Sequence, residues 1–219
     1  MGETAPGAKP VRPLCGAAES APWGAVKAYY DQRAPEYDDW WLGTGLHADR
    51  DRPGWDEERD LMADFISGLR AARTLDIACG TGFLTRHLRG EVVGLDASVR
   101  MLEVARRQAP NARLVQGDAL ALPFEDGAFE RVFASCFYCH LEEPERRRFL
   151  AEARRVAPEL VVVASMPGEG DPLDRWEERR LTDGSRWTVY KRVFTGKQLA
   201  DELGGKVVFE GDWFVVVRA

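Results

Sequence analysis

The first residues that suggest chemistry form one eight-residue run, LDIACGTG at positions 75–82. An acid, Asp76, lies inside a short apolar segment, and Gly80 and Gly82 follow it. Two glycines let the backbone turn tightly and approach a ligand without a Cβ in the way. The run therefore predicts a turn after a strand that binds a nucleotide-like cofactor.

The residues around this turn discriminate among cofactors, because several classes of site share a glycine-rich turn. The dinucleotide fingerprint G-x-G-x-x-G has a third glycine, and Thr85 occupies that position here. Asp76 would repel a pyrophosphate at the turn but could receive a cationic amino group. The pattern favours a zwitterionic ligand that carries a sulfonium.

Two more acids follow apolar segments. Residues 91–96 end in Asp96, and residues 114–119 include Asp118. The carboxyl ends of parallel strands meet at one edge of a sheet, where open α/β folds bind ligands. There Asp96 could accept hydrogen bonds from both hydroxyls of a ribose. For Asp118 alone, a helix N-cap is an alternative role.

Four segments, in this order and spacing, resemble class I S-adenosylmethionine-dependent methyltransferases, especially the branch of the ubiquinone and menaquinone biosynthesis enzymes. They are TLDIACGTGFLTRHL, VVGLDASVRMLEVAR, LVQGDALALPFEDGAFERVFAS and FYCHLEEPERRRFLAEARRV. The resemblance covers about residues 24 to 165 and is weak beyond Ser165. It implies an α/β fold with a Rossmann-like, seven-stranded, mostly parallel sheet, an antiparallel C-terminal edge hairpin, helices on both faces and an N-terminal helical lid.

The resemblance also implies S-adenosyl-L-methionine as the cofactor and a role for each matching residue. Gly80, Thr81 and Gly82 match the turn around the methionine part of the cofactor, with Asp76 near its amino group. Asp96 matches the acid that binds the ribose. The other matches are Met101 against the adenine face, Asp118 and Ala119 beside the adenine amino group, Ser135 after the fourth strand, and Ala78, Ala97 and Gly117 as further cofactor-binding positions.

Composition is that of a soluble enzyme. The 219 residues are 45% hydrophobic and 30% charged, long enough for one domain with a full core. No stretch approaches the ~20 apolar residues that cross a bilayer, so we expect no membrane contact and a cytoplasmic location. The net charge of −6, with both signs interspersed, argues against nucleic acid as a partner. The cluster Arg146 to Arg148 alternates with glutamates, which predicts an ion-paired helix face rather than a phosphate site.

The cysteines do not indicate a metal site. They are at positions 15, 79, 136 and 139, and the last two have C-x-x-C spacing. A structural zinc ion needs four ligands, and no second pair is available. We expect reduced cysteines and no metal. Cys79 replaces a larger or glycine-like residue of many relatives, and we expect it to be tolerated because cysteine is small and often buried.

The helices and strands that position these residues are predicted from hydrophobic periodicity and from the positions of glycine and proline. Glycines and prolines in residues 1–20 predict a flexible leader, and residues 21–219 predict one domain. Alternating strand and helix patterns from 74 to 163 are typical of a parallel sheet with crossovers. We expect helices over 25–32 and 56–69, a first crossover helix that includes His87, and closing strands near 207–209 and 213–217.

Aromatic residues concentrate in two regions that form a lid over the active site in relatives, residues 24–70 and about 168–195 here. The rings could surround an apolar or planar acceptor and attract a sulfonium by ~0.5–2 kcal/mol, or they could anchor the lid to the core. Tyr29 and Arg33 are the lid residues that we expect near the cofactor, with Arg33 near its carboxylate. The aromatic residues are Tyr29, Tyr30, Tyr37, Trp40, Trp41, Trp55, Trp176 and Trp187.

Methyl transfer from a sulfonium is an in-line displacement that positioning and desolvation can accelerate. A general base is needed only where the acceptor must lose a proton. His140 is the candidate catalytic residue, because its ordinary pKa suits proton abstraction near neutral pH; packing beneath the cofactor is the alternative. His47 in the lid is a second candidate, and His87 is expected at the surface.

The sequence predicts a methyltransferase that acts on a small-molecule acceptor and releases S-adenosylhomocysteine. A cofactor-binding protein without catalysis is one alternative, and a nicotinamide-dependent oxidoreductase is another that Thr85 disfavours. O-, N- and C-methylation stay open, although the family branch suggests C-methylation of a quinone ring. Cations in residues 177–192 could meet an anionic acceptor or lie on a solvated strand pair. These cations are Arg179, Arg180, Arg186, Lys191 and Arg192.

Overall fold

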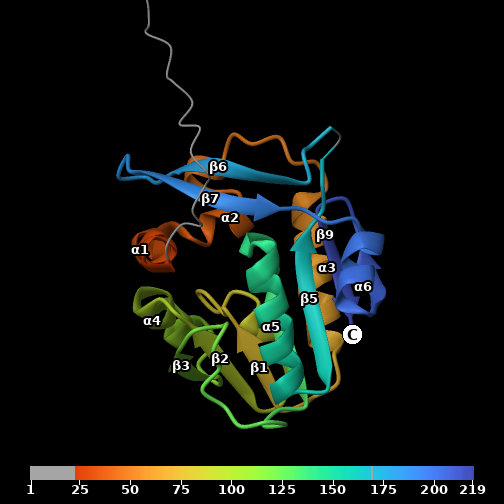
Figure 1. The fold of residues 1–219 in the computed structure, drawn as a ribbon. Helices are drawn as coiled ribbons and strands as arrows, with labels where there is room; N and C mark the ends of the chain where they lie inside the picture. Colours follow the sequence, from red (N-terminus) through yellow and green to blue (C-terminus); the bar gives the residue numbers. More distant parts are fainter. Residues whose placement is uncertain (1–22, 169) are drawn as a thin grey trace, which may run out of the picture.

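The computed structural model describes residues 23–168 and 170–219, and its main element is a seven-stranded sheet (Figure 1). The strands are β1 (Thr74–Ile77), β2 (Val92–Asp96), β3 (Arg113–Gln116), β4 (Arg131–Ser135), β5 (Glu159–Ser165), β8 (Lys206–Glu210) and β9 (Phe214–Arg218). Their order is β3-β2-β1-β4-β5-β9-β8. The first five pair in parallel, and β9 pairs antiparallel with both β5 and β8. The predicted mostly parallel sheet with an antiparallel C-terminal hairpin is confirmed.

Helices cover both faces of this sheet. Strands β2 and β3 lie on one side of β1 in the sheet, and β4 and β5 lie on the other side. Because crossover connections are right-handed, the helices that precede β3 and β5 lie on opposite faces of the sheet. The crossover helices are α4 (Val99–Gln108) and α5 (Glu143–Val156). In Figure 1, α5 crosses in front of the sheet and α3 (Trp55–Gly68) lies behind it. A further helix, α6 (Gly196–Leu203), leads into the C-terminal hairpin.

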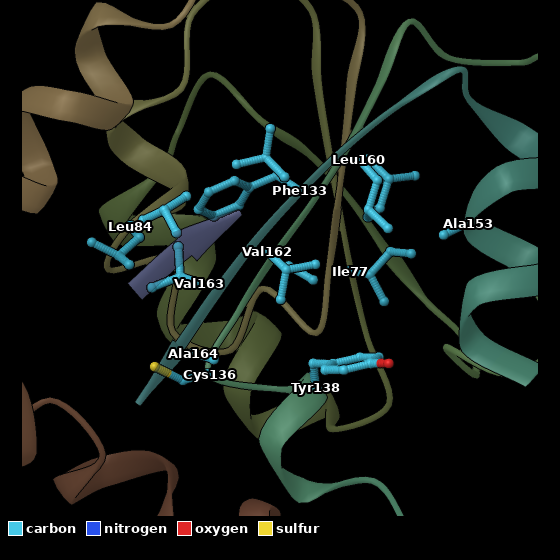
Figure 2. Close-up of a cluster of buried hydrophobic side chains, with 14 of the residues drawn as sticks. Ile77, Leu84, Phe133, Cys136, Tyr138, Ala153, Leu160, Val162, Val163 and Ala164 are labelled. Atoms are coloured by element: carbon cyan, nitrogen blue, oxygen red, sulfur yellow. The ribbon is translucent and has the colours of Figure 1, made fainter. Parts of the chain in front are cut away.

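The core lies on both faces of the central strands, as continuous apolar runs in a parallel sheet require. Side chains of β5 alternate: Figure 2 shows Val162 with Ile77 toward Ala153 of α5, and Val163 with Phe133 on the other face. All four of these strand residues are fully buried. A sheet packed this way holds the carboxyl ends of β1 and β4 in fixed positions.

The predicted N-terminal lid region contains three α-helices and two short 3-10 turns. Two of the α-helices were predicted: they are α1 (Trp23–Arg33) and α3, which begins at Trp55. A short helix, α2 (Asp39–Leu42), was not predicted, and it ends where Gly43 adopts φ 65°. The predicted leader, residues 1–20, lies outside the described residues.

The expected first crossover helix around His87 is wrong. Between β1 and β2 the chain forms only a 3-10 turn over Thr85–His87. Gly82 and Gly90 have φ of 79° and 100°, which interrupts helical backbone at both ends of the segment. The Thr85 hydroxyl also donates to Asp76, and such side-chain bonds compete with a regular helix.

The second predicted lid region is an antiparallel strand pair, β6 (Asp174–Arg180) and β7 (Arg186–Arg192), which forms a separate two-stranded sheet. Figure 1 places it across the carboxyl end of the main sheet. One face is not solvated, since Val189 and Lys191 are buried. The prediction of a solvated strand pair is therefore correct for the other face alone.

The basic cluster on α5 is ion-paired, as predicted, but it is not all at the surface. Arg147 pairs with Glu143 on the exposed face. Arg146 is buried, and its Nε donates to Glu202 of α6 at 2.6 Å. The cluster thus joins α5 to α6 rather than forming a phosphate site. No helix in the described part of the chain is long and apolar enough to span a membrane.

A buried carboxylate attaches α3 to the edge of the sheet. The Glu58 side chain accepts hydrogen bonds from the backbone N–H groups of Asp212, Trp213 and Phe214 at 2.8, 3.0 and 2.7 Å. Glu58 is only 7% exposed. These bonds fix the turn that starts β9.

We predict that Glu58→Ala lowers the free energy of unfolding by about 3 kcal/mol, because buried N–H groups lose their acceptor. Urea denaturation monitored by circular dichroism measures the change. Glu57→Ala, at an exposed position of the same helix, should stay within about 0.5 kcal/mol. Equal effects of the two substitutions would contradict this role of Glu58.

Candidate functional site

A cavity of about 420 Å³ lies at the carboxyl ends of β1 to β4, between the sheet and α1. This volume is within the range of small-ligand sites. Nine of the predicted cofactor residues line the cavity, although they come from separate loops. They are Ala78, Gly80, Asp96, Ala97, Met101, Gly117, Asp118, Ala119 and Ser135.

Nine further lining residues were not predicted. Two of them, Tyr30 and Tyr37, belong to the predicted aromatic lid region, but the aromatic pattern alone does not indicate which rings face the cavity. Cys136 and Phe137 directly follow β4. The full set is Val26, Lys27, Tyr30, Tyr37, Leu95, Ser98, Gln116, Cys136 and Phe137.

Tyr29 does not line the cavity. Its buried ring packs with Leu181, Val189 and Trp187 of the β6–β7 region. Two further contacts join α1 and its following turn to the same region: Glu36 accepts from the Thr182 backbone N–H at 2.9 Å, and Gln32 donates to Asp183. The role of Tyr29 beside the cofactor stays a prediction, and its observed contacts connect the two parts of the lid.

Arg33 lies behind the cavity wall. Its guanidinium is 4.6 Å from the centroid of the Tyr37 ring, a cation–π distance. No carboxylate of the described residues pairs with it in the structure. The predicted contact with a carboxylate of the cofactor remains a prediction.

Two backbone positions in the wall are in a sparsely populated conformation. Ala78 and Cys136 have φ of 56° and 52°, and they are the non-glycine residues with positive φ within ranges 23–168 and 170–219. Each directly follows a parallel strand and lines the cavity. Left-handed conformations of such residues cost on the order of 1–3 kcal/mol and concentrate at ligand sites.

Asp96 joins the first two strand-end loops. Its Oδ2 accepts from the Gly80 N–H at 2.9 Å, and its Oδ1 accepts from the Ser98 N–H at 2.8 Å. Burial raises the pKa of Asp96, while these backbone donors oppose that shift. Each carboxylate oxygen has a second lone pair, so the side chain can still accept bonds from a diol.

Asp118 follows β3 without capping a helix. Its Oδ1 accepts from the Leu120 N–H at 2.8 Å, and the segment makes a bridge from Asp118 to Ala121. The side chain is exposed at the cavity, with one oxygen left for a ligand. The helix N-cap alternative is therefore wrong.

Ser135 ends β4 with a buried hydroxyl that has no hydrogen-bond partner among the described residues. Buried polar groups are almost always satisfied, and an exception needs an explanation. A polar ligand in the cavity, which Ser135 lines, would supply the partner.

Three other predicted residues support the turn from behind. Asp76 is 2% exposed, and its Oδ2 accepts from the Thr85 hydroxyl at 2.6 Å. Thr81 donates to Asp38 at 2.6 Å, which ties the glycine turn to the lid. Gly82 packs against Ala105 of α4: a Cβ added to Gly82 would lie 3.3 Å from the Cα of Ala105. Their direct contact with a cofactor stays a prediction.

His140 is half-buried and lies near the cavity rather than in its wall. It lines a smaller hollow that shares Val26, Tyr30 and Phe137 with the main cavity. Its Nδ1 lies 2.8 Å from the Tyr190 carbonyl oxygen. Burial and the charge of Lys191 lower the pKa of His140 well below 6.5, so the ring is neutral. A neutral ring that donates through Nδ1 leaves Nε2 as a free acceptor.

The other histidines are outside the cavity. Burial, together with the charge of Arg50, lowers the pKa of His47 to about 4, and its buried Nδ1 has no partner among the described residues. His87 is half-buried beside Arg86, so the expectation of a surface residue is only partly met. Neither places a base beside the cavity.

Cys79, Cys136 and Cys139 are buried free thiols. Cys79 packs against Gly94: a Cβ added to Gly94 would lie 3.0 Å from the Sγ of Cys79. The Cys139 thiol donates to the Cys136 carbonyl at 3.1 Å. In the described part of the chain, no three side chains of His, Cys, Asp or Glu form a possible metal site. Cys15 lies outside it.

We predict that Asp76 makes stability depend on pH. Burial raises the pKa of Asp76 from 3.8 to about 7, against the opposing Thr85 bond. A raised folded-state pKa gives a stabilisation that is complete below about pH 4 and is lost as the pH rises through about 7. Asp76→Asn removes this loss, so its free energy of unfolding should rise relative to wild type by about 2 kcal/mol or more between pH 4 and pH 8.

Urea denaturation at several pH values measures this difference. Asp64→Asn, at an exposed position on α3, is the matched control and should show a constant difference. If the Asp76→Asn profile ran parallel to wild type, the raised pKa would be refuted.

Residues 74–159 match the family model of a methyltransferase domain. A demethylmenaquinone methyltransferase of Renibacterium salmoninarum is 34% identical over 134 residues, which are 60% of this chain and 53% of that protein. A 2-phytyl-1,4-naphtoquinone methyltransferase of Thermosynechococcus vestitus is 35% identical over 118 residues, 49% of each chain. The chain thus spans about half the length of these curated relatives.

Solved structures share the fold. The DhpI–SAM–HEP complex has a TM-score of 0.70 and 22% identity, and the match covers 90% of this chain and 96% of that one. A protein of Pyrococcus horikoshii, PH0226, has a TM-score of 0.57 and 19% identity, with coverage of 84% and 97%. Together these findings show that residues 74–159 match a methyltransferase domain and that the chain has a Rossmann-like α/β fold shared with S-adenosylmethionine-bound structures.

Proposed function

We propose that this protein transfers a methyl group from S-adenosylmethionine to a small-molecule acceptor and releases S-adenosylhomocysteine. The observation that carries the proposal is the cavity at the strand ends, in which Asp96, Asp118 and Ser135 come together. The match of residues 74–159 to a methyltransferase domain supports the same activity. We also propose a cytoplasmic location, supported by the buried free thiols of the described residues.

The donor set fits an adenosyl ligand. Asp96 offers acceptors for the ribose hydroxyls, and the free oxygen of Asp118 suits an adenine amino group. The unpartnered Ser135 hydroxyl gives the ligand one more polar contact. Met101 is buried in the wall between them and offers an apolar surface to a planar base.

When bound, S-adenosylmethionine supplies an electrophilic methyl group on a sulfonium. The chain's own residues then position the acceptor and exclude water, and both effects lower the barrier. Tyr30 and Tyr37 close the cavity from the lid side. Where the acceptor must lose a proton, the free Nε2 of neutral His140 is available as a base.

The nicotinamide alternative has less support. A dinucleotide site needs a glycine where the chain has Thr85, whose hydroxyl here is bonded to buried Asp76. Asp96 also places a carboxylate beside the turn that would hold a pyrophosphate.

Calorimetric titration of the purified protein tests the proposal. Wild type should bind S-adenosylhomocysteine at submillimolar concentration, and Asp96→Ala should weaken binding by about 30-fold or more, as expected for the loss of about 2 kcal/mol of hydrogen bonding. Asp96→Asn keeps one acceptor oxygen and should have an intermediate effect. Transfer of labelled methyl to a panel of small molecules then measures activity.

Glu103→Ala, at an exposed position of α4, is the control and should bind as wild type does. No binding by wild type, or a change of NADH fluorescence on mixing, would count against the proposal. Unchanged affinity of Asp96→Ala would remove only the ribose role of this residue.

A further inference from the structure

Lys191 is a buried cation without a carboxylate partner. It is 8% exposed, and its Nζ donates to the Ser165 hydroxyl at 2.8 Å and lies 3.2 Å from the Cys139 sulfur. No carboxylate of the described residues forms an ion pair with it. Burial of an ammonium among neutral groups is costly, so buried lysines are usually paired.

This ammonium lies close behind the wall of the cofactor cavity. Ser165 ends β5, and Cys139 belongs to the turn after β4. The Cys139 thiol donates to the carbonyl of Cys136, and Cys136 lines the cavity. A chain of two contacts, through Cys139 and Cys136, therefore connects Lys191 with the wall of the cavity at the carboxyl end of β4.

The face of the β6–β7 strand pair that carries Lys191 has an excess of positive charge. Alternation and register place Arg175, Glu177 and Arg179 on this less exposed face. Glu177 is their acid partner and pairs with both arginines. Glu177 is the one carboxylate on this face of the strand pair, and Arg175 has a second, longer ion pair with Asp171 at 3.9 Å.

The positive charges of Lys191 and Arg33 act on Cys136 in the cavity wall. Burial raises the pKa of the Cys136 thiol to about 12, but the charges of Lys191 and Arg33 act against this rise. The same two cations and Arg179 also contribute to the lowered pKa of His140, after burial. Their field therefore covers the end of the cavity that Cys136 and Tyr30 line.

We propose that the methyl acceptor is a small molecule with an oxyanion, a carboxylate or a phospho group, whose charge Lys191 and Arg179 neutralise beneath the β6–β7 pair. This inference rests on the proposed function and specifies the acceptor. An anion would balance the unpaired ammonium, and it would also be attracted to a sulfonium in a site of low dielectric. The strand pair lies beyond residues 74–159, so the matched domain does not contain these cations.

The test uses the full chain saturated with S-adenosylhomocysteine and four probes: phenylphosphonate, benzoate, neutral benzamide and 1,4-naphthoquinone. Calorimetry should show that at least one of the two anions binds at least tenfold more tightly than benzamide and naphthoquinone. Phenylphosphonate and benzoate separate a phospho group from a carboxylate. Lys191→Met and Arg179→Met should each weaken the preferred anion at least tenfold and leave affinity for S-adenosylhomocysteine unchanged.

Arg180→Met is the matched control, because it removes one positive charge from the exposed face of β6. It should leave anion binding unchanged, and Lys191→Arg should retain most of it. If Lys191→Met fails to fold, Arg179→Met and Lys191→Arg still decide the question. Equal binding of anions and neutral probes, equal effects of Arg180→Met and Arg179→Met, or weaker binding of S-adenosylhomocysteine to Lys191→Met would overturn the inference. Failure of wild type to bind S-adenosylhomocysteine would instead refute the proposed function.

Discussion

The site depends on one carboxylate, that of Asp96, which holds two loops together. Its two oxygens accept backbone N–H groups from Gly80, in the turn after β1, and from Ser98, which starts α4. In the first of these loops, Gly80 has φ of 55° and Ala78 has φ of 56°, a sparsely populated backbone conformation. A charged acceptor offsets the cost of this backbone. The same side chain that shapes the cavity is thus placed to bind the ligand.

The lid is attached to the sheet by the same kind of bond. Asp31 of α1 accepts from the Ser98 hydroxyl at 2.6 Å, and Asp38 accepts from the Thr81 hydroxyl at 2.6 Å. Ser98 and Thr81 both belong to the loops that Asp96 organises. α1 and the turn before α2 therefore meet the sheet at the two loops that Asp96 joins, whereas α3 is attached at the turn that starts β9.

The sequence allowed prediction of the sheet and of the loops around it because their signals are local. Asp96 and Gly80 stand at fixed spacing after short apolar strands, and any parallel sheet brings such strand ends together. The faces of the lid could not be predicted in this way. Adjacent Tyr29 and Tyr30 on α1 point about 100° apart, and only the packing of Tyr29 against β7 decides which ring lines the cavity. Alternation along β7 likewise assigns Lys191 to one face of the strand. Burial of that face depends on packing against residues far away in the sequence, such as Cys139 in the turn after β4.

The contacts of Tyr29, Glu36 and Gln32 with residues 181–189 make α1 and the β6–β7 pair one mechanical unit. α1 borders the cofactor cavity, whereas the strand pair carries the cations of the inferred acceptor site. A displacement that opens one compartment also opens the other. Access to the cofactor cavity and access to the inferred acceptor site are therefore mechanically coupled within the described part of the chain.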